Sequence, residues 1–204
     1  MGYLPAGARN TVADVAGVRV GHATLASGAQ QTGVTVLLPA DGNLFMHKLP
    51  AGLAVINGFG KSAGLVQLEE LGQIETPIAL TNTFGVSAVV QAQIVDCIAQ
   101  NPECGRSLST VNALTLECND GYLNDIQRMA VTAEHYQAAL RAASCDVQQG
   151  AVGAGRGMTC YQLKGGIGSA SRVVEVAGQS WTVGALVLAN MGKLADLRWD
   201  GARV

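Results

Sequence analysis

The stretch "PIALTNTFGVSAVVQAQIVDCIAQN", residues 77–101, places a short apolar run before a long one. The first run, 77–83, ends in polar residues and is typical of a strand. The second run, 86–101, is rich in Ala, Val and Ile and ends before Pro102, and the position before a proline disfavours helix. The stretch therefore predicts a strand followed by a largely buried helix.

A strand followed by a helix is also predicted earlier in the chain. The β-branched run 34–38 and the apolar run 52–58 are both typical of strands. Between residues 61 and 71 the apolar residues follow a helical period, and Gly72 is placed to end that helix.

The second half of the chain shifts toward strands. Residues 111–118 alternate in part, and 132–143 predict a helix with Thr132 as its N-cap. Three further strands are predicted, near 158–163, 171–177 and 182–190. Because helices cluster in the middle and strands at the end, the sequence predicts α+β layers and not a repeating βαβ wrap. We expect a single domain spanning 1–204, since this length suits one core.

The composition indicates a chain that buries much of its surface. Apolar residues make up 49% and charged residues 14%, whereas about 25% charged residues is typical. We therefore expect an oligomer or a subunit. A net charge of -2 and the lack of any Lys or Arg run argue against nucleic-acid and membrane partners. The 26 glycines, nearly twice the usual share of about 7%, predict tight turns and close backbone contacts.

The cysteines predict neither a disulfide framework nor a metal site. Their number is odd, no CxxC pair occurs, and no histidine lies at metal-ligand spacing. Reduced thiols fit a cytoplasmic protein, and we expect no metal and no cofactor. We find no targeting segment, and no apolar run reaches the roughly 18 to 20 residues of a membrane span.

Three glycine clusters superficially resemble phosphate-binding loops: "NGFGKSAG" (57–64), "GAVGAGRG" (150–157) and "GGIGSASR" (165–172). None has the glycine spacing of the dinucleotide fingerprint or of the P-loop. A nucleotide-binding domain is therefore not favoured. We expect the clusters to be turns that pack close to a neighbouring strand.

Two polar motifs interrupt the apolar chain. "ECNDGYLNDI" (117–126) is the densest polar patch, and "LVLANMG" (186–192) ends an apolar strand on an asparagine. Tyr122 and Asn190 are both side chains that can donate a hydrogen bond to a developing oxyanion. Turn chemistry alone favours a surface turn with Asx capping for the first motif, and Asn190 is open between capping a turn and holding a ligand.

The order of several motifs is similar to that of a known family. They are "NTVADVAGVRVGHAT", "TGVTVLLP", "LPAGLAVINGFGKSAGL", "PIALTNTFGVSAV", "NDGYLNDI", "GRGMTCYQLKGGIGSASR" and "GALVLANMG". Together they resemble the L-aminopeptidase/D-esterase family, which includes β-aminopeptidases. The resemblance extends over nearly the whole chain.

This resemblance implies an N-terminal-nucleophile hydrolase with a four-layer α-β-β-α sandwich. In the family a precursor cuts itself into an α chain and a β chain, and the N-terminal Ser or Thr of the β chain is the nucleophile. The 204 residues then correspond to the α subunit, and the nucleophile lies on a separate β chain. The resemblance also implies a tetramer of αβ units and small peptide, amide or ester substrates.

The resemblance also assigns roles to residues of this sequence. Tyr122 and Asn190 are expected near the nucleophile as catalytic residues. Asn82, Glu117 and Asp120 are expected to bind the substrate.

One departure from the family pattern concerns "GAGRGM", where Arg156 replaces a small residue. If it faces the pocket, Arg156 selects acidic substrates; if it faces solvent, it has no role, and we favour the solvent-facing position. A different class of function is a non-catalytic homologue, a binding or scaffold protein that lacks a working β chain.

Overall fold

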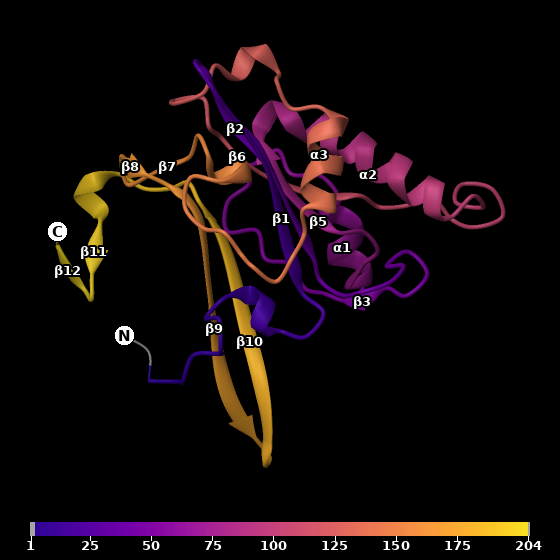
Figure 1. Ribbon diagram of the computed structural model, residues 1–204, viewed down its shortest axis with the longest axis horizontal. Helices are drawn as coiled ribbons and strands as arrows, with labels where there is room; N and C mark the ends of the chain where they lie inside the picture. Colours follow the sequence, from indigo (N-terminus) through magenta and orange to yellow (C-terminus); the bar gives the residue numbers. More distant parts are fainter. Residues whose placement is uncertain (1–2, 204) are drawn as a thin grey trace.

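The computed structural model describes residues 3–203, and its centre is a four-stranded sheet (Figure 1). The strands are β1 (Arg19–Ser27), β2 (Gln30–Leu38), β5 (Ile78–Asn82) and β6 (Leu114–Cys118), in the spatial order β1-β2-β5-β6. β2 pairs antiparallel with β1 and β5, whereas β5 and β6 are parallel. A parallel pair needs a crossover connection, and the chain supplies one through α2 (Val86–Gln100).

Two helices cover one face of this sheet. α2 and α3 (Ala133–Arg141) contact each other, and α3 also contacts β1 and β2. Alternate residues of β2, Val34 and Val36, point into the core beneath the helices, as the two-residue period of a strand requires. The other buried members of this core are Ala79, Val89, Ala92, Val131, Tyr136 and Ala139.

A long hairpin packs against the opposite face. It consists of β9 (Gly166–Val176) and β10 (Gln179–Ala189), which are antiparallel over their whole length. Near the sheet the hairpin shares a core that contains Leu80, Ala154 and Ile167. Its far end projects beyond the sheet, where large apolar side chains such as Trp181 are exposed (Figure 1). Residues 3–203 thus form three successive layers: helices, sheet and hairpin.

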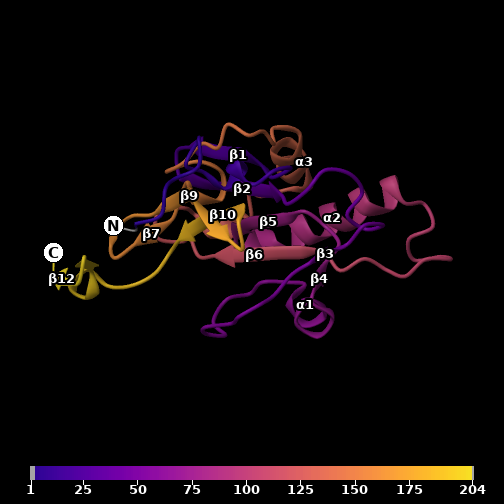
Figure 2. The same cartoon turned by 90° about the horizontal axis from the view of Figure 1, so that it is seen from below.

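The remaining elements are short. α1 (Leu65–Leu71) lies beyond the β6 edge of the sheet (Figure 2). The short strands pair as β3 with β4, β7 with β8 and β11 with β12. The bounds of the short strands and of the 3-10 turns, in chain order, are η1 (Val12–Asp14), β3 (Leu49–Pro50), β4 (Gln73–Ile74), η2 (Thr83–Gly85), η3 (Ile126–Arg128), η4 (Gly153–Gly155), β7 (Thr159–Cys160), β8 (Leu163–Lys164), η5 (Leu194–Asp196), β11 (Arg198–Trp199) and β12 (Ala202–Arg203). Across residues 3–203, no helix has the length and apolar character needed to traverse a membrane.

Most of the predicted elements are confirmed. The strand and helix of 77–101 appear as β5 and α2, Gly72 ends α1 in a left-handed conformation, and Thr132 precedes α3 as its N-cap. The predicted strand at 52–58 is wrong. That segment is an exposed loop in which the Ile56 side chain is 97% exposed, so its apolar residues find no partner strand within the described chain.

The strand β1 was not predicted, and a glycine explains why. Gly21 interrupts the β-branched pattern of this segment. In the structure an added Cβ at Gly21 would overlap the carbonyl of Ala139 in α3, so the glycine permits a close approach of helix and strand. β9 also begins earlier than predicted, because the glycine-rich segment from Gly166 is itself paired with β10. The predicted strand near 158–163 is divided into β7 and β8 by a tight turn.

The glycine loop 150–157 confirms the expectation of close backbone packing. Gly153 has a φ of +51° and lies against the Thr35 hydroxyl, where a Cβ would not fit. Gly157 lies equally close to the backbone carbonyl of Gln31 in β2. In the cluster 57–64 the expectation fails at Gly58, where an added Cβ would meet no atom within 4 Å.

Candidate active site

The polar motif after β6 forms a tight turn, residues 119–125, which we call the tyrosine turn. Asn119 Oδ1 accepts a hydrogen bond from Gly121 N at 2.9 Å, which is an Asx turn. The carbonyl of Asp120 accepts from the amides of Leu123 and Asn124 at 3.1 and 3.0 Å. The turn presents Tyr122 outward, with its side chain 85% exposed. The Asx-turn interpretation is therefore confirmed, and the same turn displays a free phenol.

Asn190 follows the last residue of β10 and joins two backbone segments. Its Nδ2 donates to the carbonyl of Asn119 at 3.0 Å and to the carbonyl of Thr159 at 3.1 Å. A carboxamide nitrogen carries two protons, so both are used in this arrangement. Asn190 therefore ends its strand as a clamp between the tyrosine turn and β7.

A single pocket brings Tyr122 and Asn190 together. It has a volume of about 390 Å³. Its lining residues are Tyr122, Thr159, Gln162, Asn190, Met191 and Gly192. None of these side chains is charged, so the pocket offers hydrogen bonds and aromatic surface without a fixed ion. Tyr122 and Asn190 come from separate layers, and only the packing of the hairpin on the sheet places them side by side.

The rim of the pocket contains an unusual concentration of left-handed backbone. Tyr161 and Gln162, the two residues of the β7–β8 turn, have φ of 54° and 63°, and Gly192 has a φ of 75°. Tyr161 N donates to Met191 O at 2.6 Å, and Gln162 Oε1 accepts from Leu194 N at 3.1 Å. Residues other than glycine with a left-handed backbone carry strain, and such strain is commonly found at functional sites. These contacts interlock the β7–β8 turn with the segment after β10.

Glu117 lies at the end of β6 and lines a different cavity. Its Oε1 accepts from the amide of Lys61 at 2.7 Å, and its Oε2 accepts from the Thr83 hydroxyl at 2.9 Å. The cavity, about 430 Å³, lies between sheet and hairpin and is otherwise lined mainly by apolar side chains. The neighbouring Cys118 lines the same cavity, and burial raises the pKa of its thiol to about 11. Cys118 is thus held as an unreactive thiol near neutral pH.

Asn82 and Asp120 lie beneath the surface. Their side chains are 2% and 1% exposed, and neither lines the pocket of Tyr122. Asn82 Oδ1 accepts from Gly85 N at 2.7 Å and so caps η2. Arg156 is half-buried, its Nε donates to Gln31 Oε1 at 2.7 Å, and it does not line that pocket. The structure therefore groups two of the five predicted site residues in one pocket, places Glu117 on a different cavity and buries Asn82 and Asp120.

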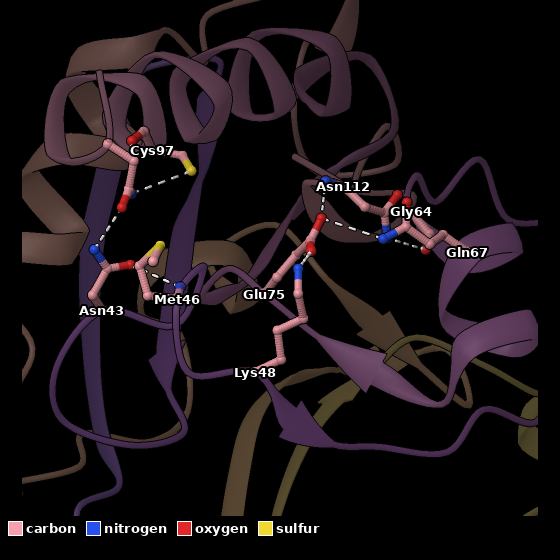
Figure 3. Close-up of polar contacts among 9 residues, drawn as sticks. Asn43, Met46, Lys48, Gly64, Gln67, Glu75, Cys97 and Asn112 are labelled. Atoms are coloured by element: carbon pink, nitrogen blue, oxygen red, sulfur yellow. Dashed lines mark hydrogen bonds and ion pairs between the residues drawn. The ribbon is translucent and has the colours of Figure 1, made fainter. Parts of the chain in front are cut away.

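A second polar cluster, centred on Glu75, lies in another part of the molecule (Figure 3). The buried Glu75 carboxylate accepts from Lys48 Nζ, from Gln67 Nε2 and from the backbone amide of Asn112. These bonds join β4, α1 and the segment before β6. Because the Glu75 side chain is buried and accepts three hydrogen bonds from other parts of the chain, we interpret this cluster as a structural tie. Within residues 3–203, no group of three or more His, Cys, Asp or Glu is arranged to hold a metal ion.

Sequence reasoning missed part of the pocket lining. Thr159, Gln162 and Met191 lie inside quoted motifs but were not singled out, because their positions on the pocket depend on the β7–β8 turn and on the path of the chain after β10. Gly192 did carry a signal, because a glycine after a strand that ends on asparagine indicates a turn, and its positive φ confirms that turn.

The comparisons with known proteins agree on one family. A model of peptidase family S58 matches residues 10–204. The β-peptidyl aminopeptidases BapA of Sphingosinicella xenopeptidilytica and Sphingosinicella microcystinivorans are 40% and 42% identical over 97% of the chain. The chain spans 51% of the length of each of these curated relatives.

Solved structures give the same result. The PH0078 protein of Pyrococcus horikoshii OT3 is 47% identical with a TM-score of 0.97, over 100% of this chain and 60% of that one. A β-aminopeptidase of a Burkholderia species is 43% identical with a TM-score of 0.89, over 97% of this chain and 57% of that one. The L-aminopeptidase D-Ala-esterase/amidase of Ochrobactrum anthropi, described as a variant of the Ntn hydrolase fold, is 33% identical with a TM-score of 0.89, over 98% and 59%. The α+β architecture described above is therefore that of the Ntn-hydrolase variant.

Proposed function

The chain belongs to peptidase family S58, and from this membership we propose that the full-length protein is an autoprocessed N-terminal-nucleophile aminopeptidase or amidohydrolase. It removes N-terminal residues from short peptides, amides or esters. The nucleophile is the N-terminal Ser or Thr of a β chain made from the same precursor. The observation that carries this proposal is the single pocket shared by the exposed Tyr122 and by Asn190.

The proposed reaction is acyl transfer. The β-chain hydroxyl oxygen bonds to the substrate carbonyl carbon, and its proton passes to the β-chain α-amine or to a nearby group. The carbonyl oxygen becomes an oxyanion, to which the Tyr122 hydroxyl donates a hydrogen bond. The C–N bond then breaks, the amine leaves with the proton, and water releases the acyl group. Tyr122 suits this role because its side chain is exposed and its hydroxyl makes no hydrogen bond to any group among residues 3–203.

Asn190 requires a more specific proposal. Both of its Nδ2 protons are donated to backbone carbonyls, so a third acceptor must replace one of them. We assign the Thr159 bond to this exchange, because Thr159 itself lines the pocket. The bond to Asn119 then keeps the carboxamide oriented while the other proton is donated to the oxyanion.

Glu117 is the proposed ligand of the substrate amine. Its carboxylate accepts one hydrogen bond at each oxygen, and a carboxylate has about four acceptor positions, so capacity remains for an ammonium group. Direct contact between substrate and Asn82 or Asp120 would require the structure around them to rearrange, because both side chains are buried. We propose no role for Arg156 in selecting acidic substrates, because its Nε donates to Gln31 and it does not line the pocket.

The proposed partner is the β chain, with αβ units assembled into a tetramer. The cavity between sheet and hairpin and the exposed apolar side chains Trp181, Val183 and Val187 offer surface for further strands. A cytoplasmic location is also proposed, and the five unpaired cysteines are consistent with it.

The alternative is a non-catalytic binding or scaffold protein. Intact mass spectrometry of the denatured full-length protein, with N-terminal sequencing of every chain, distinguishes the two. A small chain that begins with Ser or Thr, together with hydrolysis of amino-acid p-nitroanilides, supports the enzyme. A single uncleaved chain without amidase activity refutes it and favours the binding protein.

A further inference from the structure

We propose that Asp120 is a positioning residue, whose buried carboxyl group anchors the tyrosine turn to β2 and thereby fixes both Tyr122 and the carbonyl that orients Asn190. The functional part of this inference rests on the proposed amidohydrolase activity. It replaces direct substrate binding as the role of Asp120.

The tyrosine turn buries the carboxyl group of Asp120 and exposes the phenol of Tyr122. Asp120 is 1% exposed, whereas the side chain of Tyr122, two residues later, is 85% exposed. A carboxyl group that solvent does not reach cannot contact a substrate in the open pocket. Burying a carboxyl group costs free energy unless hydrogen bonds compensate, so the groups that bond to Asp120 must account for its position.

The partners of Asp120 form a chain of bonds that ends on β2. Asp120 Oδ1 accepts from Asn124 Nδ2 at 3.0 Å. Asn124 Oδ1 in turn accepts from the backbone amide of Gln31 at 2.9 Å. Asn124 is itself buried, so both ends of its carboxamide are fixed in a site without competing water. The carboxyl group of Asp120 therefore determines which way Asn124 points and how the turn sits on β2.

Side chains of β5 and β2 complete the network around Asp120. Asn82 Nδ2 donates to Thr32 Oγ1 at 3.1 Å, and both side chains are buried. Burial raises the pKa of Asp120, and the side chains of Thr32, Asn124 and Asn82 that face it act in the opposite direction. The second oxygen, Oδ2, makes no hydrogen bond within the described chain. The network thus uses Asp120 as an acceptor for Asn124, and within residues 3–203 Asp120 forms no ion pair.

The position of the tyrosine turn affects two groups of the pocket. The residue before Asp120, Asn119, provides the carbonyl that accepts from Asn190. The residue two positions after it is Tyr122, which lines the pocket. A shift of the turn therefore displaces both groups at once. Misplacing catalytic groups by about 1 Å is enough to lower turnover roughly 100-fold.

The kinetic test compares three variants of the full-length protein on an amino-acid p-nitroanilide. Asp120→Ala removes the acceptor and is expected to lower kcat about 100-fold with little change in KM. Asp120→Asn keeps an oxygen that accepts from Asn124 and is expected to restore most of kcat. Asp125→Ala is the matched control, because Asp125 belongs to the same turn but makes an exposed ion pair with Arg128 at 3.0 Å. It is expected to behave like the wild type.

Hydrogen exchange tests the anchoring without reference to activity. In Asp120→Ala, the amides of Leu123 and Asn124 should exchange faster than in the wild type, while exchange in α2 stays unchanged. Unchanged exchange in the turn overturns the proposal, and so does an Asp120→Asn variant whose KM rises while kcat is kept, as expected of a charged substrate ligand. A wild-type protein without amidase activity refutes the proposed function instead, and the exchange result then still decides the role of Asp120.

Discussion

Replacing Asn190 by alanine should lower both stability and turnover, for reasons that can be separated. The substitution removes the hydrogen bonds of Nδ2 to the carbonyls of Asn119 and Thr159, at 3.0 and 3.1 Å. At about 0.5 to 1.5 kcal/mol net for each, the free energy of unfolding should fall by about 1 to 3 kcal/mol. If Asn190 also donates to the oxyanion, kcat should fall about 100- to 1000-fold.

Tyr122→Phe and Asn190→Asp separate the two effects. Tyr122→Phe removes only a hydroxyl that is exposed, so it should lower kcat by a similar factor and leave the melting temperature unchanged. Asn190→Asp keeps the size of the side chain but turns an acceptor toward two carbonyls. It should therefore melt at a lower temperature than Asn190→Ala.

The assay combines p-nitroanilide kinetics with thermal unfolding, each on protein whose chains have been checked by mass spectrometry. An Asn190→Ala enzyme that is correctly processed and keeps kcat within about tenfold of the wild type would refute the donor role. A variant that loses turnover but melts like the wild type would instead refute the clamp between Asn119 and Thr159.

Three further predictions concern single groups. Tyr136→Phe should raise the melting temperature, because the Tyr136 hydroxyl is buried without a hydrogen-bond partner in the described chain and such a group costs about 1 to 3 kcal/mol. Gly192→Ala should lower the free energy of unfolding by at least about 1 to 2 kcal/mol, because Gly192 has a φ of 75° and packs on the Tyr161 ring. A melting curve that overlays that of the wild type would contradict the conformation described for Gly192. Burial raises the pKa of Asp120, so its contribution to stability is present below its unfolded pKa and is lost as pH rises through the folded pKa. Asp120→Asn should therefore gain stability relative to the wild type as pH rises from 4 to 8, and chemical unfolding at both pH values that shows an equal difference would exclude this.

The sequence predicted the elements whose pattern is local. In the stretch 77–101, apolar content, the polar strand end and Pro102 all point to the same result, and β5 and α2 follow it closely. The segment 52–58 has strand-like residues, but a strand forms only where a neighbour pairs with it, and the sequence does not reveal whether that neighbour exists. The reverse error occurred at Arg19–Ser27, where Gly21 weakens the pattern although the strand is fully paired with β2.

The candidate site was predictable to the extent that it lies in motifs. Tyr122 and Asn190 were identified from family resemblance, and the structure adds that one pocket contains both. Their catalytic roles remain predictions. Asn82 and Asp120 show the limit of prediction from motifs, because the sequence does not tell whether a polar side chain in a motif faces a substrate or belongs to a buried network. Gln162 could not be identified, because its place on the rim depends on the left-handed backbone of the β7–β8 turn.

The clamp made by Asn190 has a consequence for how specificity can change in this family. Both of its acceptors are main-chain carbonyls, which every amino acid possesses, so no substitution at positions 119 or 159 deletes them. The side chains of Thr159 and Met191 that line the pocket are thus free to vary while the asparagine keeps its orientation, whereas the Gln162 side chain also holds the backbone amide of Leu194. A library restricted to positions 159 and 191 would test whether substrate choice can change around the proposed reaction centre while the Asn190 clamp stays in place.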